Sequence, residues 1–210
     1  MSSILDLLNS DMGKQLIGGA SAQSGQTAEK TSSVLNMALP FLLGAMKKNS
    51  ATPDGAAGLL SALNGKHDGS ILDNLGDLFD GGVDDNVQQD GAGILGHILG
   101  GSQSKIENAL SQKSGMDAGS VTQILKVAAP ILMGVLGKQT RQNNVSDSNG
   151  LGDLLGGLMG GGQKEDQSFI ESLLDADGDG SIIDDVAGMV LGGSKKKGGI
   201  GGLLGGLFGK

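Results

Sequence analysis

The chain of 210 residues is long enough to bury roughly 70% of its unfolded surface in one or two domains. It has 40 glycines and no cysteine, tryptophan or tyrosine, which excludes disulfides, thiolate metal sites and cysteine nucleophiles. The net charge of −8, a single arginine and the scarcity of aromatic side chains argue against nucleic-acid binding.

The N-terminal segment does not have the pattern of a secretory signal. Residues 1–14 lack a basic leader, and Asp6 and Asp11 interrupt their apolar stretch. We therefore expect a cytoplasmic protein. The longest apolar stretch, residues 34–46, is shorter than the about 20 residues that cross a bilayer, and it contains Pro40. It predicts a buried helix.

An internal repeat organises the chain. An offset of 90 aligns residues 15–48 with a later stretch without a gap, which predicts a duplicated helical unit. In each copy a Ser-Gly pair, ending at Gly25 and at Gly115, is typical of a helix end with glycine in the left-handed conformation. A new helix is expected to start two residues later, at Thr27 and Asp117. Each unit is thus predicted to be a helix, a turn and a longer helix.

The longer helix of each copy carries apolar residues on nearly every face, so it must be buried. Pro40 and Pro130 each remove a backbone hydrogen bond and are expected to kink these helices. Gly44 and Gly134 follow one turn later, and we expect the two long helices to cross closely there. The predicted fold class is all-α: a Gly-rich bundle of duplicated helical units with kinked, buried central helices.

Beyond the long helices the repeat continues with a shift. Residues 53–63 resemble residues 148–158, which implies five inserted residues around 141–148. That polar, asparagine-rich insert is predicted to be a loop, and residues 81–90 are predicted to be a loop between the units. Nothing in the sequence alternates as a strand would.

These patterns divide the chain into three predicted parts. Residues 1–103 form a first helical repeat, and residues 104–193 form a second repeat that contains an EF-hand-like loop. Residues 194–210 form a basic tail rich in glycine and leucine.

Carboxylates at alternate positions in residues 175–185, with a glycine at the turn, match the first half of an EF-hand calcium loop. The twelfth position, where an EF-hand supplies a bidentate glutamate, is Val186. The alternative is a solvated turn whose aspartates favour the start of the next helix. Calcium, bound weakly, is the one cofactor that the sequence suggests. Its predicted ligands are Asp175, Asp177, Asp179, the carbonyl of Ser181, and Asp184 or Asp185.

The corresponding segment of the first copy, residues 64–74, is predicted to be a turn without a metal. It keeps Asp68 but has Lys66 where the second carboxylate should be. His67 and His97 have no paired carboxylate or histidine at helical ligand spacing, so neither is expected to bind a metal or act as a general base. His97 is expected at the surface or half-buried with a partner. No nucleophile elbow or phosphate-binding loop is recognisable, which favours a non-enzymatic protein.

The basic tail, residues 194–210, places lysines at both ends of a short apolar segment. Surface-active peptides that lie on anionic membranes share this pattern. The alternative is a flexible terminus whose Leu-Phe end packs against the protein or a second copy, because so many glycines make a poor free helix.

Three segments, residues 90–101, 111–138 and 173–193, resemble the YidB-like family of bacterial proteins, catalogued as domain of unknown function nine-three-seven. The strings GHI, QKSG and APILMG match recurring blocks of that family in the same order, and the resemblance covers nearly the whole chain. It implies a small, mainly helical bacterial protein, and it supplies no activity, cofactor or catalytic residue.

The combined prediction is a non-enzymatic structural or interaction protein that self-associates as a homo-oligomer. Two duplicated apolar helices make more apolar surface than one small bundle would hide. The alternative is a peripheral membrane-surface protein that acts through the tail. Nucleic acid is not expected as a partner, and the sequence identifies no small-molecule substrate.

Overall fold

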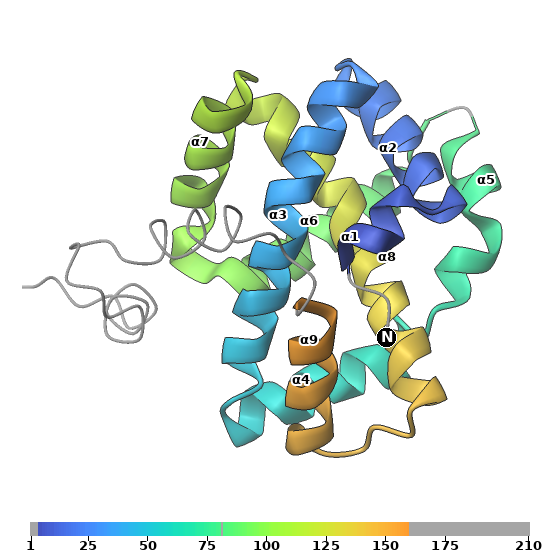
Figure 1. The fold of residues 1–210 in the computed structure, drawn as a ribbon, viewed down its shortest axis with the longest axis vertical. Coiled ribbons are helices and arrows are strands. Elements are labelled where there is room, and N and C mark those ends of the chain that lie inside the picture. The colour runs from blue at the N-terminus through green and yellow to red at the C-terminus, as the bar shows by residue number, and fades with distance from the viewer. Residues whose placement is uncertain (1–3, 81, 160–210) are drawn as a thin grey trace, which may run out of the picture.

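The computed structural model describes residues 4–80 and 82–159, and the regular elements within them are all helices, with no strand (Figure 1). The all-α prediction is confirmed. The elements are α1 (Ile4–Asn9), α2 (Asp11–Ser24), α3 (Ala28–Asn49), α4 (Pro53–Asn64), the 3₁₀ helix η1 (Ser70–Asn74), α5 (Leu75–Phe79), α6 (Asp85–Leu99), the 3₁₀ helix η2 (Gly100–Ser102), α7 (Gln103–Ser114), α8 (Ala118–Gln142) and α9 (Ser148–Met159).

Both predicted turns form between a shorter and a longer helix. Gly25 follows α2 with φ 64°, and Gly115 follows α7 with φ 66°, a conformation that glycine adopts without strain. The Thr27 hydroxyl accepts a hydrogen bond from a backbone N–H at the start of α3, and the Asp117 carboxylate does the same for α8. The predicted order of helix, turn and longer helix is confirmed in both places.

The two turns lie side by side and join the two halves of the chain. The side-chain amide of Gln26 donates to the hydroxyl of Ser120 at 3.0 Å. Helix α2 packs on α8, and α3 packs on α7, so each half contacts the other. One continuous apolar cluster therefore extends across the predicted boundary between residues 103 and 104.

Helix α8 runs through the centre, beside α3 (Figure 1). Its buried residues point in every direction, because α2, α3, α4, α6 and α7 all pack around it. Within the described residues α8 alone is long and apolar enough to cross a membrane, and 78% of its most apolar window is buried inside the protein. The core helix of a soluble protein has the same properties, so this is weak evidence for a membrane span.

The predicted crossing of the long helices at Gly44 and Gly134 is wrong. A Cβ atom on Gly44 would meet only the Met159 side chain of α9, at 3.6 Å, and one on Gly134 would meet Ile71 of η1 at 2.5 Å. The close backbone approaches to α8 occur elsewhere. A Cβ on Gly91 of α6 would collide with the Lys126 carbonyl. Helix α9 lies beside Gly44 and η1 lies beside Gly134, so the two long helices do not meet at these glycines.

The predicted loop over residues 81–90 is confirmed only for residues 82–84, because α6 begins at Asp85. The Asp84 carboxylate accepts a hydrogen bond from the Asn86 N–H at 2.7 Å and so caps the helix. The polar residues form its exposed first turns, and burial begins at Gly91.

The insert around residues 141–148 is only partly a loop. Helix α8 continues to Gln142, and residues 143–147 form the connection to α9. The loop prediction is confirmed for those residues, while the first part of the insert lengthens α8.

Candidate functional site

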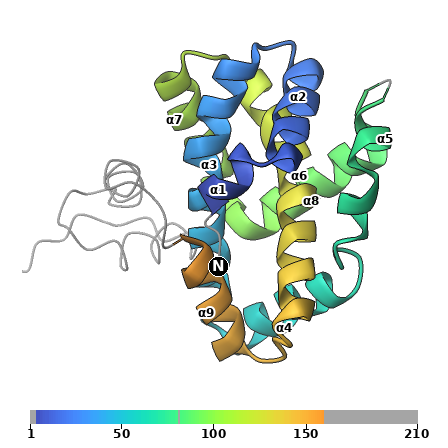
Figure 2. The same cartoon turned by 45° about the vertical axis from the view of Figure 1, so that its right-hand side comes forward.

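A pocket of about 550 Å³ is lined mainly by residues of α4 and α6. Helix α4 lies beside α9 at one end of the molecule (Figure 1 and Figure 2). We call this pocket the α4–α6 pocket. Met46 of α3 and Met133 of α8, both buried, line it together with half-buried Leu59 of α4 and Ile98 of α6. Most of its surface is therefore apolar.

Hydrogen bonds fix the start of α4 and the end of α6, which both border the pocket. The Thr52 hydroxyl caps α4 by accepting the Gly55 N–H at 3.2 Å. Helix α4 buries only Ala56 and Leu63, so its remaining side is free to border the pocket. The end of α6 is tied to α3 by Asn49, whose side-chain amide faces the carbonyls of His97 and Ile98 at 3.4 and 3.3 Å.

Two exposed glycines border the pocket without a packing reason. Gly58 of α4 and Gly93 of α6 both line it, and a Cβ atom at either position would meet no atom within 4 Å. In this they differ from Gly91, whose hydrogen faces the backbone of α8. Their missing side chains widen the pocket and expose helix backbone in its walls.

The polar part of the pocket is a charged group that sequence spacing did not reveal. His67, which follows α4, is 8% exposed, and its Nδ1 lies 3.8 Å from Oδ2 of Asp90 on α6. The other carboxylate oxygen of Asp90 pairs with Nζ of Lys66 at 2.6 Å. Burial lowers the pKa of His67, the Asp90 carboxylate opposes that shift, and Lys66 reinforces it. The imidazole is therefore neutral at pH 7.

The sequence offered His67 no carboxylate at helical spacing, and the partner that the structure shows, Asp90, comes from another helix. His97 is exposed on α6 and lines the same pocket, as the surface alternative for it predicted. One signal could have found half of this site: Asp90, Gly93 and His97 are spaced to share one face of a helix. Nothing local in the sequence could place His67 opposite them.

The chemistry available in the pocket suits binding of an apolar group with one polar end. Its hydroxyl, Thr52 Oγ1, is held by the helix cap and by a hydrogen bond to the Asn49 carbonyl at 3.1 Å. Across residues 4–80 and 82–159, no three histidine, aspartate or glutamate side chains converge to hold a metal. The His67–Asp90 pair can orient or hydrogen-bond a bound molecule.

In residues 64–74 the charged side chains of Lys66 and Asp68 are already engaged. Lys66 pairs with Asp90, and the Asp68 carboxylate pairs with Nη1 of Arg141 at 3.2 Å. Asp68 also accepts the Ser70 N–H at 3.0 Å, which closes a tight turn before η1. The predicted calcium ligands Asp175, Asp177, Asp179, Ser181, Asp184 and Asp185 lie outside the described residues, as does the tail of residues 194–210.

Comparison with known proteins gave one finding. A family model described as "Bacterial protein of unknown function (DUF937)" matches residues 6–139. The match ends near the C-terminus of α8 and includes every residue named above as lining the α4–α6 pocket. Neither the curated proteins nor the solved structures gave a match.

Proposed function

This protein belongs to that bacterial family of unknown function, which the YidB-like resemblance identified, and from its pocket we propose a non-enzymatic interaction protein that binds an apolar group between α4 and α6. The observation that carries this proposal is the open apolar pocket beside a core whose other helices are closely packed. Ligand sites usually have about 300–1,000 Å³, so a pocket of about 550 Å³ suits a small molecule or a few side chains.

The two unpacked glycines support binding over a purely structural role. A glycine in a helix interior costs about 1 kcal/mol relative to alanine, and Gly58 and Gly93 gain no packing in return within the chain. A bound molecule that packs against Gly58 and Gly93 would supply the missing packing. A turnover found in a broad hydrolase screen would count against the non-enzymatic part of the proposal.

Binding is tested by titrating the full-length protein with the neutral apolar dye Nile red. Gly93→Leu should fill the pocket and weaken dye binding at least tenfold. Gly96→Leu is the matched control, because Gly96 is exposed on the same helix, meets no atom within 4 Å and does not line the pocket. Equal dye affinity of the two variants would contradict the proposal.

The duplicated unit is part of the same proposal. It is supported by the correspondence of α2 with α7, α3 with α8 and α4 with α9, and by the left-handed glycine after α2 and after α7. In this proposal α4 and α9 are equivalent helices of 12 residues each.

We also propose that the protein is cytoplasmic and self-associates. The reason for self-association is the apolar pocket and not, as the sequence suggested, the apolar faces of the long helices. The long helices bury their apolar faces within one chain, so they leave little surface for a second copy. The α4–α6 pocket is the apolar surface that a partner could cover. Light scattering that shows only monomer at tens of micromolar would contradict self-association, and flotation of the full chain with anionic liposomes would favour the membrane-surface alternative.

A further inference from the structure

The last residues of the chain have a pattern that matches an apolar groove. The segment 198–209 has five apolar residues at helical spacings of three and four, and its remaining positions are all glycine. The five are Ile200, Leu203, Leu204, Leu207 and Phe208. On a helix these five side chains would share one face, which is how amphipathic segments place anchors in a groove. Because glycine disfavours a free helix, such a segment needs a surface against which to order.

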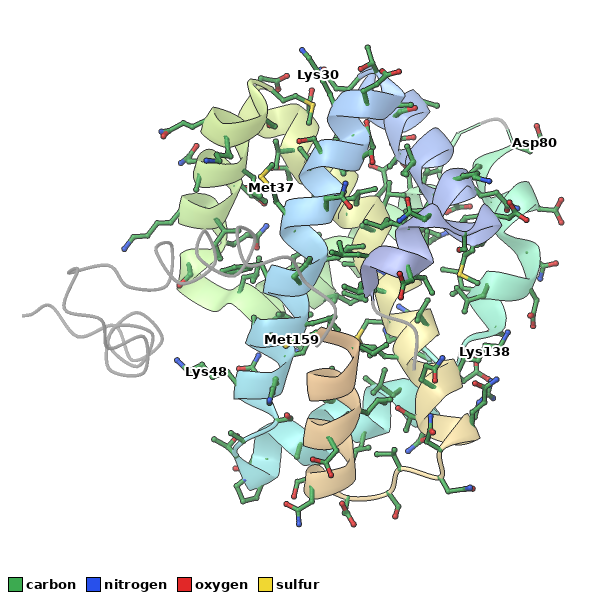
Figure 3. All side chains as sticks on the ribbon, viewed as in Figure 1. Lys30, Met37, Lys48, Asp80, Lys138 and Met159 are labelled. Atoms are coloured by element: carbon green, nitrogen blue, oxygen red, sulfur yellow. The ribbon has the colours of Figure 1, made fainter. Side chains whose placement is uncertain are left out.

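The described chain ends at α9, which packs along α3 and α4, two helices that also border the α4–α6 pocket. Met159, the last residue of α9, lies beside α3 (Figure 3). Its Cε atom is 3.6 Å from the place that a Cβ atom on Gly44 would take. Met46, two residues further along α3 and therefore on another side of that helix, lines the pocket. Residues 160–199 link Met159 to Ile200, and at up to about 3.3 Å each they can easily reach the pocket.

The walls of the pocket suit leucine side chains. Its lining is mostly apolar, and at Gly58 and Gly93 nothing within 4 Å fills the place of a Cβ atom. A leucine from another segment can therefore lie directly against the backbone of α4 and α6. The five apolar residues of the tail, with glycines between them, offer such side chains without bulky neighbours.

The charge of the tail and its covalent link to the chain both favour its binding to the described part of the same protein. The tail carries Lys195, Lys196, Lys197 and Lys210, while the rest of the chain has a net charge of −12, given the total of −8. A tethered segment also reaches an effective concentration near millimolar, which no free partner matches in dilute solution.

We propose that residues 200–208 of the same chain occupy the α4–α6 pocket and that an external partner must displace them. This inference rests on the proposed function, because it names the occupant of the same pocket. In the isolated protein the tail then fills the pocket, and it competes there with any external ligand.

The absence of cysteine allows a direct test in the full-length chain. In the variant Gly58→Cys with Leu204→Cys, an intramolecular disulfide should form under mild oxidation at least ten times faster than in Gly18→Cys with Leu204→Cys. Gly18 is the matched control, because it is exposed on α2, far from α4, and meets no atom within 4 Å (Figure 1). Equal rates would overturn the inference, and so would disulfide-linked dimers as the main product, since they would place a second copy in the pocket.

Dye binding separates this inference from the proposed function. Leu203→Asp with Leu207→Asp, in the full chain, should tighten Nile red binding at least tenfold, because the competitor is removed. Unchanged affinity that still depends on Gly93→Leu would overturn the inference and leave the proposed function standing. Dye binding that does not depend on Gly93→Leu, in either chain, would overturn both.

Discussion

Helices α4 and α9 have the same length and share the spacing of three leucines, but the protein buries them differently. In α9, Leu154 is 2% and Leu155 is 0% exposed. At the aligned positions of α4, Leu59 and Leu60 are only half-buried, and Leu59 borders the pocket. Helix α9 packs along α3 and α4, whereas one side of α4 faces the open pocket. The same pattern of apolar residues therefore marks a packed helix in one place and the wall of an open pocket in another.

The largest expected effect comes from truncating equivalent leucines. Leu155→Ala should lower the free energy of unfolding by about 3 kcal/mol, because it leaves a cavity in the core. Leu60→Ala should cost about 1 kcal/mol, since its side chain is already partly exposed. Urea denaturation followed by circular dichroism measures both. Equal losses would show that α4 is as firmly packed as α9 and would erase the comparison.

A second pair of equivalent positions, Gly134 and Gly44, tests the same contrast inside the long helices. Gly134→Ala would place its Cβ 2.5 Å from Ile71, so the β-branched side chain must move, at a cost of about 1–3 kcal/mol. Gly44→Ala meets only the flexible end of Met159 at 3.6 Å and should stabilise α3 by up to about 1 kcal/mol. Thermal unfolding gives the two signs, and the same sign for both would contradict the packing described.

Calcium is expected to distinguish the two Asp-Gly segments of the sequence. We propose that Asp177, Asp179 and their neighbours in the second segment bind calcium, whereas in the first segment Lys66 and Asp68 are already engaged in ion pairs. For a dissociation constant of about 1 mM, 10 mM calcium should stabilise the bound state by about 1.4 kcal/mol. Titration calorimetry should show heat in the native chain and none in Asp177→Ala with Asp179→Ala. Heat that remains in the double variant would remove the second segment as the site.

The smallest expected effect is a pH dependence of the free energy of unfolding that His67, just after α4, causes. Because burial lowers the pKa of His67, the unfolded chain binds its proton more readily than the folded protein does. The stability due to neutral His67 is fully present above pH 6.5 and is lost as the pH falls toward the lowered pKa. His67→Gln should therefore flatten the dependence of unfolding free energy on pH between about 5 and 7. An unchanged slope would mean that His67 does not cause it.

Local signals in the sequence predicted the local structure well. The Ser-Gly turns and the caps at Thr27 and Asp117 depend on residues a few positions apart, so their chemistry can be recognised without the fold. The start of α6 was missed although Asp84 is a good cap, because glycine and aspartate are also common in loops.

Contacts between residues far apart in the sequence could not be predicted. Gly134 was expected to meet the other long helix, yet Ile71 fills that space. His67 meets Asp90 only because the chain turns after α4 and α6 then packs across α8. The pocket is a space that several elements leave between them, and no single stretch of sequence encodes it.

The central place of α8 also determines when the protein can fold during its synthesis. The faces of α2, α3, α4 and α6 that α8 covers are all made before Ala118 leaves the ribosome. At about 5–20 residues per second, the nascent chain carries these apolar faces uncovered for several seconds until α8 is complete. We therefore expect the first half not to fold ahead of the second, and ribosome-bound chains that stop before α8 to be held by chaperones.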